Sequence, residues 1–345
     1  MVFFDKFRDP TANVCQLSGP GGAMGLRNLA DIRSVLWVVI AAALVGLQIA
    51  KPELAPYLFW VSCYFALACG VMAHNHNHCP TFKNKQSSEL FGIALSVFYG
   101  YPTFAWIPTH NLNHHKFVNK AGDATITWRY SKKHSFWVAL IYPFVSGYYQ
   151  SAPTKEFIDK AREKNPKLYR RILTQYFVWV GAHLSLLGIS IAVNGFRVGL
   201  VTWVLCCFIP AVFALWTIML FNYEQHVHTD PWSEHNHSRS FTSPTLNFLL
   251  FNNGYHAAHH EYPGVHWTKL KELHYEMAKD IDPQLMQTSV WWYWFKQYAL
   301  AWAIPSLGST QVGRAPYDPP EGASMDLTSG SVEAEEMGTN AAMVR

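Results

Sequence analysis

Three histidines lie close enough in the sequence to share one metal site: His110, His114 and His115. They occupy positions i, i+4 and i+5, and residues four apart lie on the same face of a helix, one turn above each other. Two neutral imidazoles at this spacing can bind one metal ion, and the adjacent third imidazole can reach a second ion. We therefore interpret this histidine box as a nitrogen-donor metal site on a helix.

Similar histidine groups occur three more times along the chain. One box is formed by His74 and His78, and another by His256, His259 and His260; in the remaining group His226 follows Asn222 by one helical turn. A polar helix end would explain one such group. Eight histidines in three boxes, together with His226, are costly to bury unless a metal binds them. The repetition therefore strengthens the metal interpretation.

The number of histidines favours two iron ions. Zinc in proteins usually takes four ligands, so one zinc site cannot use nine histidines. Two irons that share these nitrogen donors and keep positions open for O₂ fit the number, and iron can change its redox state. A metal transporter or metal-storage protein is the alternative from another class. It would hold its ligands in the middle of the membrane, whereas these histidines lie at the ends of apolar runs.

Composition and apolar runs indicate an integral membrane protein. Of 345 residues, 50% are hydrophobic and 14% are charged, compared with about 25% charged residues in average soluble domains. Each of four apolar runs is near the ~20 residues that span a bilayer as a helix; they cover 34–50, 55–73, 172–194 and 198–221. Short links join them in pairs. We predict an all-α membrane protein with four transmembrane helices in two hairpins, each leading into a histidine group.

Two further apolar runs, 90–109 and 135–154, are interrupted by proline and glycine. If either run crossed the bilayer alone, the histidine boxes would be divided between its two sides, and one metal site needs them together. We therefore predict interfacial or re-entrant helices for both runs, and a cytoplasmic cap that carries the histidine boxes.

The distribution of basic residues predicts the orientation. Lysine and arginine are frequent in the segment 74–171, whereas the links within the two hairpins carry only Lys51 and Arg197. The positive-inside rule then places the active site and both termini in the cytoplasm. We expect three regions: a cytoplasmic N-terminal arm (1–33), a membrane domain (34–304) and a disordered C-terminal tail (305–345).

The histidine boxes, in their order and position, resemble those of the integral-membrane fatty acid desaturase superfamily. The resemblance covers roughly residues 34–280. The run from His114 to Asp123 is similar to the family's second box with its trailing Asn and Gly-Asp, and the third box runs into Pro263 as in the family. The segment 222–226 resembles the element that supplies a further ligand in stearoyl-CoA desaturases and membrane alkane hydroxylases.

The resemblance implies two ferrous ions held by nine histidines: His74, His78, His110, His114, His115, His226, His256, His259 and His260. It also implies that Asn222 holds a metal-bound water or completes a metal shell, with His228 as the rival of His226. The side chains expected to orient imidazole N–H groups from outside the shell are those of Asn119, Asp123, Glu224 and Glu261.

By the same resemblance we expect an O₂-dependent oxidoreductase that introduces a cis double bond into the fatty acyl chain of a lipid. A membrane di-iron hydroxylase of an alkane, a terpenoid or a lipid is the alternative, and no residue in the sequence separates the two. The arm and the tail are too short to fold as a redox domain. We therefore expect an external electron donor of the ferredoxin, rubredoxin or cytochrome type with its reductase, and no nucleic-acid partner.

Overall fold

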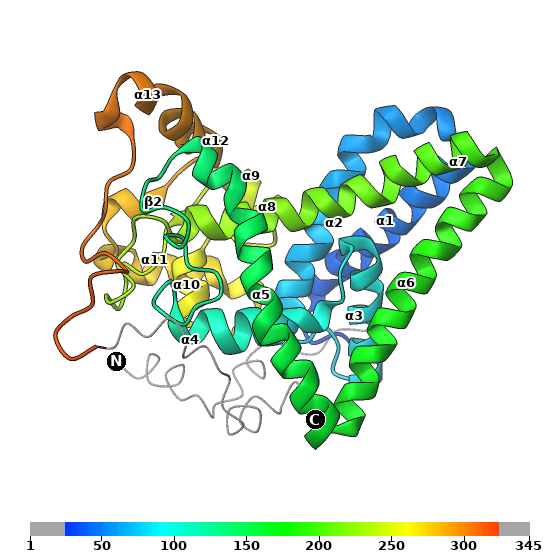
Figure 1. Cartoon of the computed structure of the whole chain (residues 1–345), viewed down its shortest axis with the longest axis horizontal. Helices are drawn as coiled ribbons and strands as arrows, with labels where there is room; N and C mark the ends of the chain where they lie inside the picture. Colours follow the sequence, from blue (N-terminus) through cyan, green and yellow to red (C-terminus); the bar gives the residue numbers. More distant parts are fainter. Residues whose placement is uncertain (1–24, 324–345) are drawn as a thin grey trace. The chain divides into compact units, whose positions relative to one another are not determined.

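The computed structural model describes residues 25–323. It separates into two compact units. The first, here called the membrane unit, comprises 25–107 and 158–218, and the second, the histidine unit, comprises 108–157 and 219–323 of the described chain. The fold is all-α (Figure 1), and the short strands β1 (Ser240–Phe241) and β2 (Met286–Gln287) are the exception among the described residues.

The first hairpin of the membrane unit consists of α1 (Ile32–Ala50) and α2 (Ala55–His78). Lys51 and the 3₁₀ turn Pro52–Leu54 separate the two helices, because proline removes a backbone donor and interrupts helical hydrogen bonding. The buried amide of Gln48 on α1 donates to the Ser62 hydroxyl on α2 at 2.8 Å. Such a bond between polar side chains holds two helices together where water is excluded.

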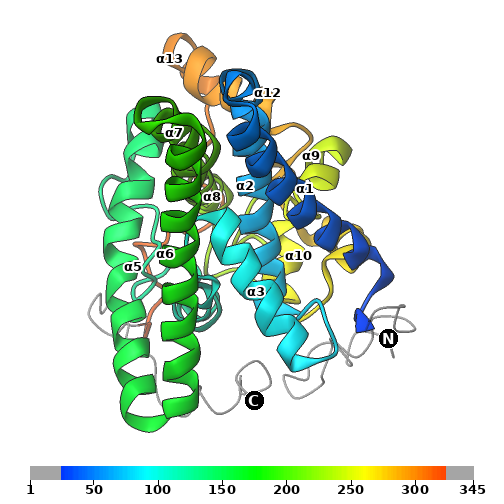
Figure 2. The same cartoon turned by 90° about the vertical axis from the view of Figure 1, so that its right-hand side faces the viewer.

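The second hairpin begins with α6 (Pro166–Asn194), which turns at Gly195 into α7 (Phe196–Trp203). A π-helical turn, Val204–Phe208, joins α7 to α8 (Ile209–His226). Helices α6 and α7 approach each other closely at Gly199, where an added Cβ atom would lie 2.4 Å from the carbonyl oxygen of Ser190. Figure 2 shows α6 and α7 side by side.

Among residues 25–323, four helical segments are long and apolar enough to cross a membrane, which confirms the predicted number of spans. They are Leu29–Ala50, Pro52–His78, Pro166–Asn194 and Phe196–His226. Each is longer than the corresponding apolar run, because the helices continue into polar residues at their ends. The second and fourth segments end at His78 and His226, and both residues belong to the histidine groups of the sequence.

The two interrupted apolar runs fold differently from each other. In the run 90–109, α3 (Lys85–Tyr99) ends at Gly100, which has a left-handed φ of 88°, and the chain bends by 98° into Thr103–Phe117. The bent pair is compatible with the predicted re-entrant helix and, by its length, with a fifth broken span. In the run 135–154 the proline and glycine residues do not break the helix. From Phe136 onward this run lies within α5 (Phe136–Lys164), which continues through Pro143 and Pro153, since an internal proline removes one hydrogen bond without necessarily ending a helix.

The histidine unit is assembled from short elements. A π-helix, Ile107–His114, leads into α4 (His115–Phe117), and α9 (Pro244–Leu249) precedes α10 (His256–Glu261). The core behind α10 contains Ala257, Ala258, Leu273 and Leu285. α11 (Leu270–Met277) follows in the chain, and β1 pairs in parallel with β2. The chain then forms α12 (Val290–Phe295), the π-helix Lys296–Leu300, α13 (Ala301–Ala303) and the 3₁₀ turn Pro305–Leu307.

The segment 305–323, which we assigned to a disordered tail, has a defined structure. The backbone N–H of Val312 donates to the carbonyl of His228 at 3.1 Å, and that of Ser309 donates to the Gln297 side chain at 2.7 Å. Arg314 N–H donates to the Asp230 carboxylate at 3.0 Å. The ordered chain therefore extends beyond residue 304, because these backbone groups find partners on the histidine unit. The other predicted tail residues, 324–345, and positions 1–24 of the arm lie outside the described residues.

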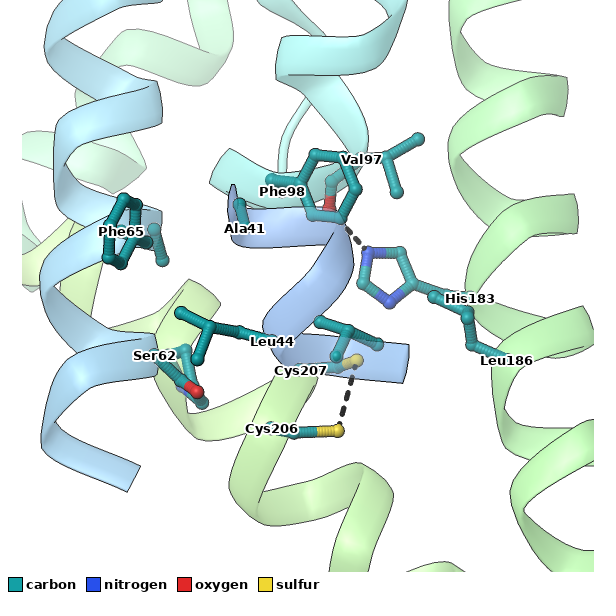
Figure 3. Close-up of a pocket in the computed structure, with 13 residues that line it drawn as sticks. Ala41, Leu44, Ser62, Phe65, Val97, Phe98, His183, Leu186, Cys206 and Cys207 are labelled. Atoms are coloured by element: carbon teal, nitrogen blue, oxygen red, sulfur yellow. Dashed lines mark hydrogen bonds between the residues drawn. The ribbon is translucent and has the colours of Figure 1, made fainter. Parts of the chain in front are cut away.

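A small cavity lies inside the membrane unit (Figure 3). Its volume is about 20 Å³, close to the minimum of about 10–15 Å³ that one water molecule needs. His183 lines it and donates from Nε2 to the carbonyl of Val97, in the last turn of α3, at 3.0 Å. This bond satisfies a carbonyl that the end of the helix leaves without an intrahelical partner. His183 therefore has a structural role at the end of α3.

Candidate metal centre

Four histidines of the histidine unit form what we call the four-histidine group: His114, His226, His256 and His260. His114 ends the π-helix, His226 ends α8, and the other two lie one turn apart on α10. Their Nε2 atoms form a closed ring with separations of 3.1, 2.9, 3.1 and 3.3 Å. Neighbouring nitrogens around an ion bound at about 2.1 Å are about 3 Å apart. The ring therefore has the dimensions of a metal shell.

Hydrogen bonding alone does not account for this ring. The Nδ1 of His114 lies 2.8 Å from the carboxylate of Asp123, and the Nδ1 of His226 lies 3.2 Å from the backbone carbonyl of His237. Both oxygens accept, so each Nδ1 carries the proton and each neutral ring has a lone pair on Nε2. These two lone pairs face each other at 3.1 Å. A cation between them removes the repulsion, so the donor set fits a metal ion.

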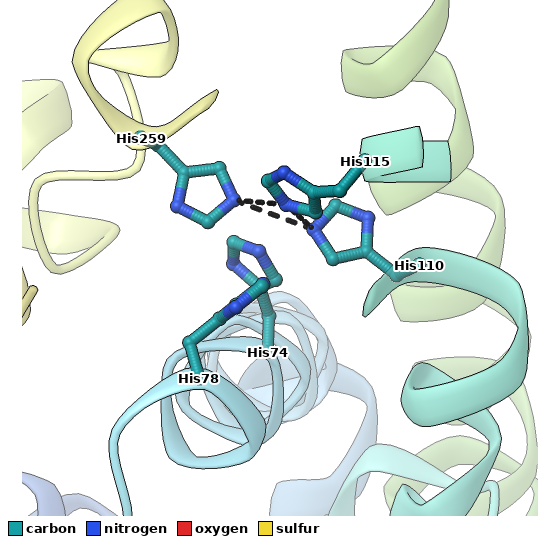
Figure 4. A group of neighbouring side chains, drawn as sticks. All are labelled: His74, His78, His110, His115 and His259. Carbon is teal, nitrogen blue, oxygen red and sulfur yellow. Dashed lines mark hydrogen bonds between the residues drawn. The ribbon is translucent and has the colours of Figure 1, made fainter. Parts of the chain in front are cut away.

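Three more histidines of this unit form a second set, the three-histidine group: His110, His115 and His259 (Figure 4). Their Nε2 atoms are 3.0, 3.0 and 3.3 Å apart, and each contacts both others. Each of the three nitrogens either carries a proton or does not, so at least two of them are in the same protonation state. At least one of the three contacts therefore joins two donors or two acceptors. A metal ion that accepts all three lone pairs removes this conflict.

The π-helix explains how one box serves both groups. We expected His110 and His114, four residues apart, to share an ion as they would on an α-helix. Instead His110 contacts His115, and His114 belongs to the other group. The segment Ile107–His114 is a π-helix, whose backbone bonds join residues five apart. This wider turn places position i+5, rather than i+4, beside His110.

The first histidine box lies in the membrane unit, at the end of α2. His74 is 3% exposed, and its ring lies 4.9 Å from that of His78 between centroids, as expected for residues one turn apart. Both are drawn in Figure 4. His76, between them, turns to the opposite side and contacts the Thr81 hydroxyl and the Ser88 carbonyl at 3.0 and 3.1 Å. As the spacing predicts, the two outer histidines share a face and the middle one does not.

Asp123 holds the ring of His114 in place, as the sequence predicts. The carboxylate is fully buried, and its oxygens accept from His114 Nδ1, from the Asn119 backbone and from the backbone and hydroxyl of Thr125, at 2.7–2.8 Å. Burial alone would raise the pKa of Asp123, but His114 and the bonds from Thr125 outweigh burial and hold this pKa below its ordinary value. The carboxyl is therefore ionised and fixes the proton of His114 on Nδ1.

Asn119 joins the same loop to the end of α8. Its side-chain amide donates to the carbonyl of His226 at 2.9 Å and accepts from the backbone N–H of Thr127 at 2.8 Å. The residue has a left-handed φ of 62°, a conformation that asparagine adopts more readily than most residues. Thr125, whose hydroxyl lies 2.9 Å from His114 Nδ1, was not among the predicted residues. Its position two residues after a buried aspartate is the local signal that identifies it.

Asn222 approaches the four-histidine group, whereas three other predicted residues do not. Asn222 Nδ2 lies 3.5 Å from His114 Nε2. Glu224 instead bonds the Tyr298 hydroxyl and pairs with His134 at 3.3 Å, and His228 contacts Ser309 at 2.9 Å. Glu261 is half-buried and makes no side-chain hydrogen bond with any residue the structure describes. In this structure the helical turn after Asn222 directs Glu224 away from the ring, and the left-handed His228 (φ 58°) reverses the chain.

Burial keeps the histidines in the form that binds metals. For His260, burial is the largest effect and neighbouring histidines add to it, so that its pKa lies well below the ordinary value. Burial likewise lowers the pKa of the adjacent His237 to about 4. At neutral pH these rings are uncharged, and a neutral imidazole has a free lone pair for a metal ion.

The sequence matches a known family over most of its length. The profile of the family described as fatty acid desaturase matches residues 52–294, a range that includes every histidine of both groups and the box at the end of α2. The chain belongs to the fatty acid desaturase family.

One curated relative matches part of the chain. A sphingolipid delta(4)-desaturase of Candida albicans is 40% identical over 62 residues, which is 17% of this chain and 17% of the relative. The match therefore spans less than a fifth of either chain. No solved structure matches the chain.

Proposed function

We propose that this desaturase uses two iron ions and O₂ to introduce a cis double bond into the acyl chain of a membrane lipid. The observation that carries the proposal is the arrangement of seven imidazole Nε2 atoms in two sets, each with separations of 2.9–3.3 Å that hydrogen bonds do not explain. Nitrogen donors in this number, together with family membership, favour redox-active iron over zinc.

The ligands of the two ions follow from the two groups. One ion would be held by the four-histidine group, with Asn222 beside it. The other would be held by the three-histidine group, and we propose that His74 and His78 complete its shell, since three imidazoles leave positions open and these two share one face of α2. Iron bound there would activate O₂ for the removal of two hydrogens from adjacent carbons.

The residues of this chain position that chemistry. Asp123 and Thr125 keep the proton of His114 on Nδ1, and the carbonyl of His237 does the same for His226. Each ring therefore directs a lone pair into the site before a metal arrives. Burial of the four-histidine group limits access of bulk water, which protects reactive species from side reactions. The substrate must be aligned beside this site, because orientation selects which carbons react.

The proposal extends to partners and orientation. Electrons would come from a separate ferredoxin, rubredoxin or cytochrome with its reductase. The basic segment 74–171 supports a cytoplasmic active site and cytoplasmic termini. The printed name of the relative makes sphingolipids the first substrate class to test, beside glycerolipids and free acyl thioesters.

Lipid mass spectrometry of cells expressing the wild type and His114→Ala tests the proposal, together with the iron content of the purified proteins. We expect a two-dalton loss on an acyl chain in the wild type only, and about two irons per chain. His235→Ala, a histidine substitution in the loop before His237 and outside both groups, is the matched control and should retain product and iron. A sixteen-dalton gain would identify a hydroxylase, and zinc without any product would exclude the O₂-dependent mechanism.

A further inference from the structure

The side chain of Tyr142 on α5 links two parts of the histidine unit. Its hydroxyl lies 2.5 Å from the backbone carbonyl oxygen of Thr125 and 2.8 Å from Oδ1 of Asn222. On the other side, the Asn222 amide lies 3.5 Å from Nε2 of His114. Tyr142 is 4% exposed, so water cannot substitute for these partners. The hydroxyl therefore controls an amide that borders the four-histidine group.

A count of protons shows which way this amide must face. The tyrosine hydroxyl has one proton, and a backbone carbonyl can only accept. The proton therefore belongs to the shorter contact, the one with Thr125. The side chain of Ser146 also bonds Tyr142, and a serine hydroxyl can donate to the tyrosine oxygen, so this contact agrees with the assignment. Toward Asn222 the tyrosine oxygen presents a lone pair, which requires a donor.

The Asn222 amide supplies that donor when its NH₂ end faces Tyr142. The two ends of an amide have almost the same shape, and the hydrogen-bond network decides between the two orientations. With NH₂ on Tyr142, the carbonyl oxygen of Asn222 takes the position 3.5 Å from His114 Nε2. An amide nitrogen is a poor metal ligand, whereas an amide oxygen can bind a cation directly or through water.

We propose that the Tyr142 hydroxyl turns the Asn222 amide so that its oxygen faces the four-histidine group and adds an oxygen donor to it. Tyr142 is then a positioning residue, which acts through Asn222. The inference rests on the proposed function, because it assumes a metal ion in this group. The ring of Tyr142 also packs against that of Tyr223, with 4.9 Å between the ring centroids. Removal of the hydroxyl alone therefore separates the positioning role from the packing role.

Cobalt binding tests this proposal without turnover. The measurement uses full-length protein carrying His110→Ala and His115→Ala, so that added Co²⁺ reports on the four-histidine group. Tyr142→Phe keeps the aromatic ring and removes the hydroxyl. Asn222→Leu removes the oxygen donor, and Asn222→Asp has an oxygen at either end, so it needs no orientation. Affinity comes from competition with a chelator, and the coordination number from the visible absorption of Co²⁺, which intensifies as that number falls to four.

We expect Tyr142→Phe to weaken Co²⁺ binding about tenfold and to shift the spectrum toward that of Asn222→Leu. In the Asn222→Asp background the same tyrosine substitution should change affinity less than about twofold. An unchanged spectrum in Tyr142→Phe, or an equal loss in both backgrounds, would overturn the proposal. Loss of the folded apoprotein on Tyr142→Phe, both with Asn222 intact and in the Asn222→Asp background, would also overturn the proposal and would assign Tyr142 a structural role. Absence of Co²⁺ binding when Tyr142 and Asn222 are intact would instead refute the metal site of the proposed function.

Discussion

At the level of single residues, Asp123 decides which nitrogen of His114 carries the proton. Both of its carboxylate oxygens accept from donors: Oδ2 from His114 and the Asn119 backbone, and Oδ1 from Thr125. An asparagine amide cannot replace this carboxylate, because in either orientation its NH₂ group would face two hydrogen-bond donors. The geometry therefore requires an ionised carboxylate at this position.

Asp123→Asn should lower metal affinity of the four-histidine group about 10–100-fold, the usual effect of losing a partner outside a metal shell. The physical reason is that His114 loses the acceptor that keeps its proton on Nδ1, so Nε2 is no longer free for the metal. Chelator competition on purified protein measures the change. Asp318→Asn, at a carboxylate that is 72% exposed, is the control and should have no effect. Equal affinities for the two variants would show that Asp123 does not orient His114.

At the level of elements, helix type and close helix contacts determine the site. The π-helix Ile107–His114 brings His110 beside His115 and assigns His114 to the other group. In the membrane unit, α6 and α7 meet without a side chain at Gly199, where Ser190 donates from its hydroxyl to the Gly199 carbonyl at 2.8 Å. This hairpin leads into α8, whose last residue is His226.

Gly199→Ala should destabilise the second hairpin by about 1–3 kcal/mol, as overpacking generally does, because the new Cβ would lie 2.4 Å from a backbone carbonyl oxygen that cannot move away alone. Gly188→Ala in α6 is the matched control, since nothing lies within 4 Å of its added Cβ. That substitution should be neutral or slightly stabilising. Thermal unfolding in detergent compares the two, and equal melting temperatures would contradict the close contact.

At the level of the whole molecule, the four-histidine group draws on chain segments far apart in sequence. His114 contacts residues 112 and 146 positions away, and the loop that holds it bonds to α5 and to the end of α8. The segment 305–323 packs behind this assembly. The Ser309 hydroxyl lies 2.7 Å from His134 Nδ1 and 3.0 Å from His228 Nδ1, and Val312 bonds the His228 backbone two residues after His226.

A chain that ends at residue 304 should be less stable and retain less iron than one that ends at residue 323. The shorter chain leaves the buried His134 and the half-buried His228 without these partners, and each unpaired buried polar group costs about 1–3 kcal/mol. The two truncations are matched, since both lack 324–345. Melting temperature in detergent and iron per chain are the measurements. Identical values would mean that the contacts of 305–323 do not support the site.

The sequence by itself predicted the membrane class, the four spans and the grouping of the histidines into boxes, because apolar runs and short-range spacing are local features of the chain. The family resemblance added Asp123, Asn119 and Asn222, which contact His114 or His226 in the structure. Tertiary structure alone decided that His110 joins His115, that Glu224 and His228 face Tyr298 and Ser309, and that Thr125 and Tyr142 support the site. These outcomes depend on a wider helical turn, on one left-handed residue and on contacts between distant segments. None of these features produces a regular pattern in the local sequence.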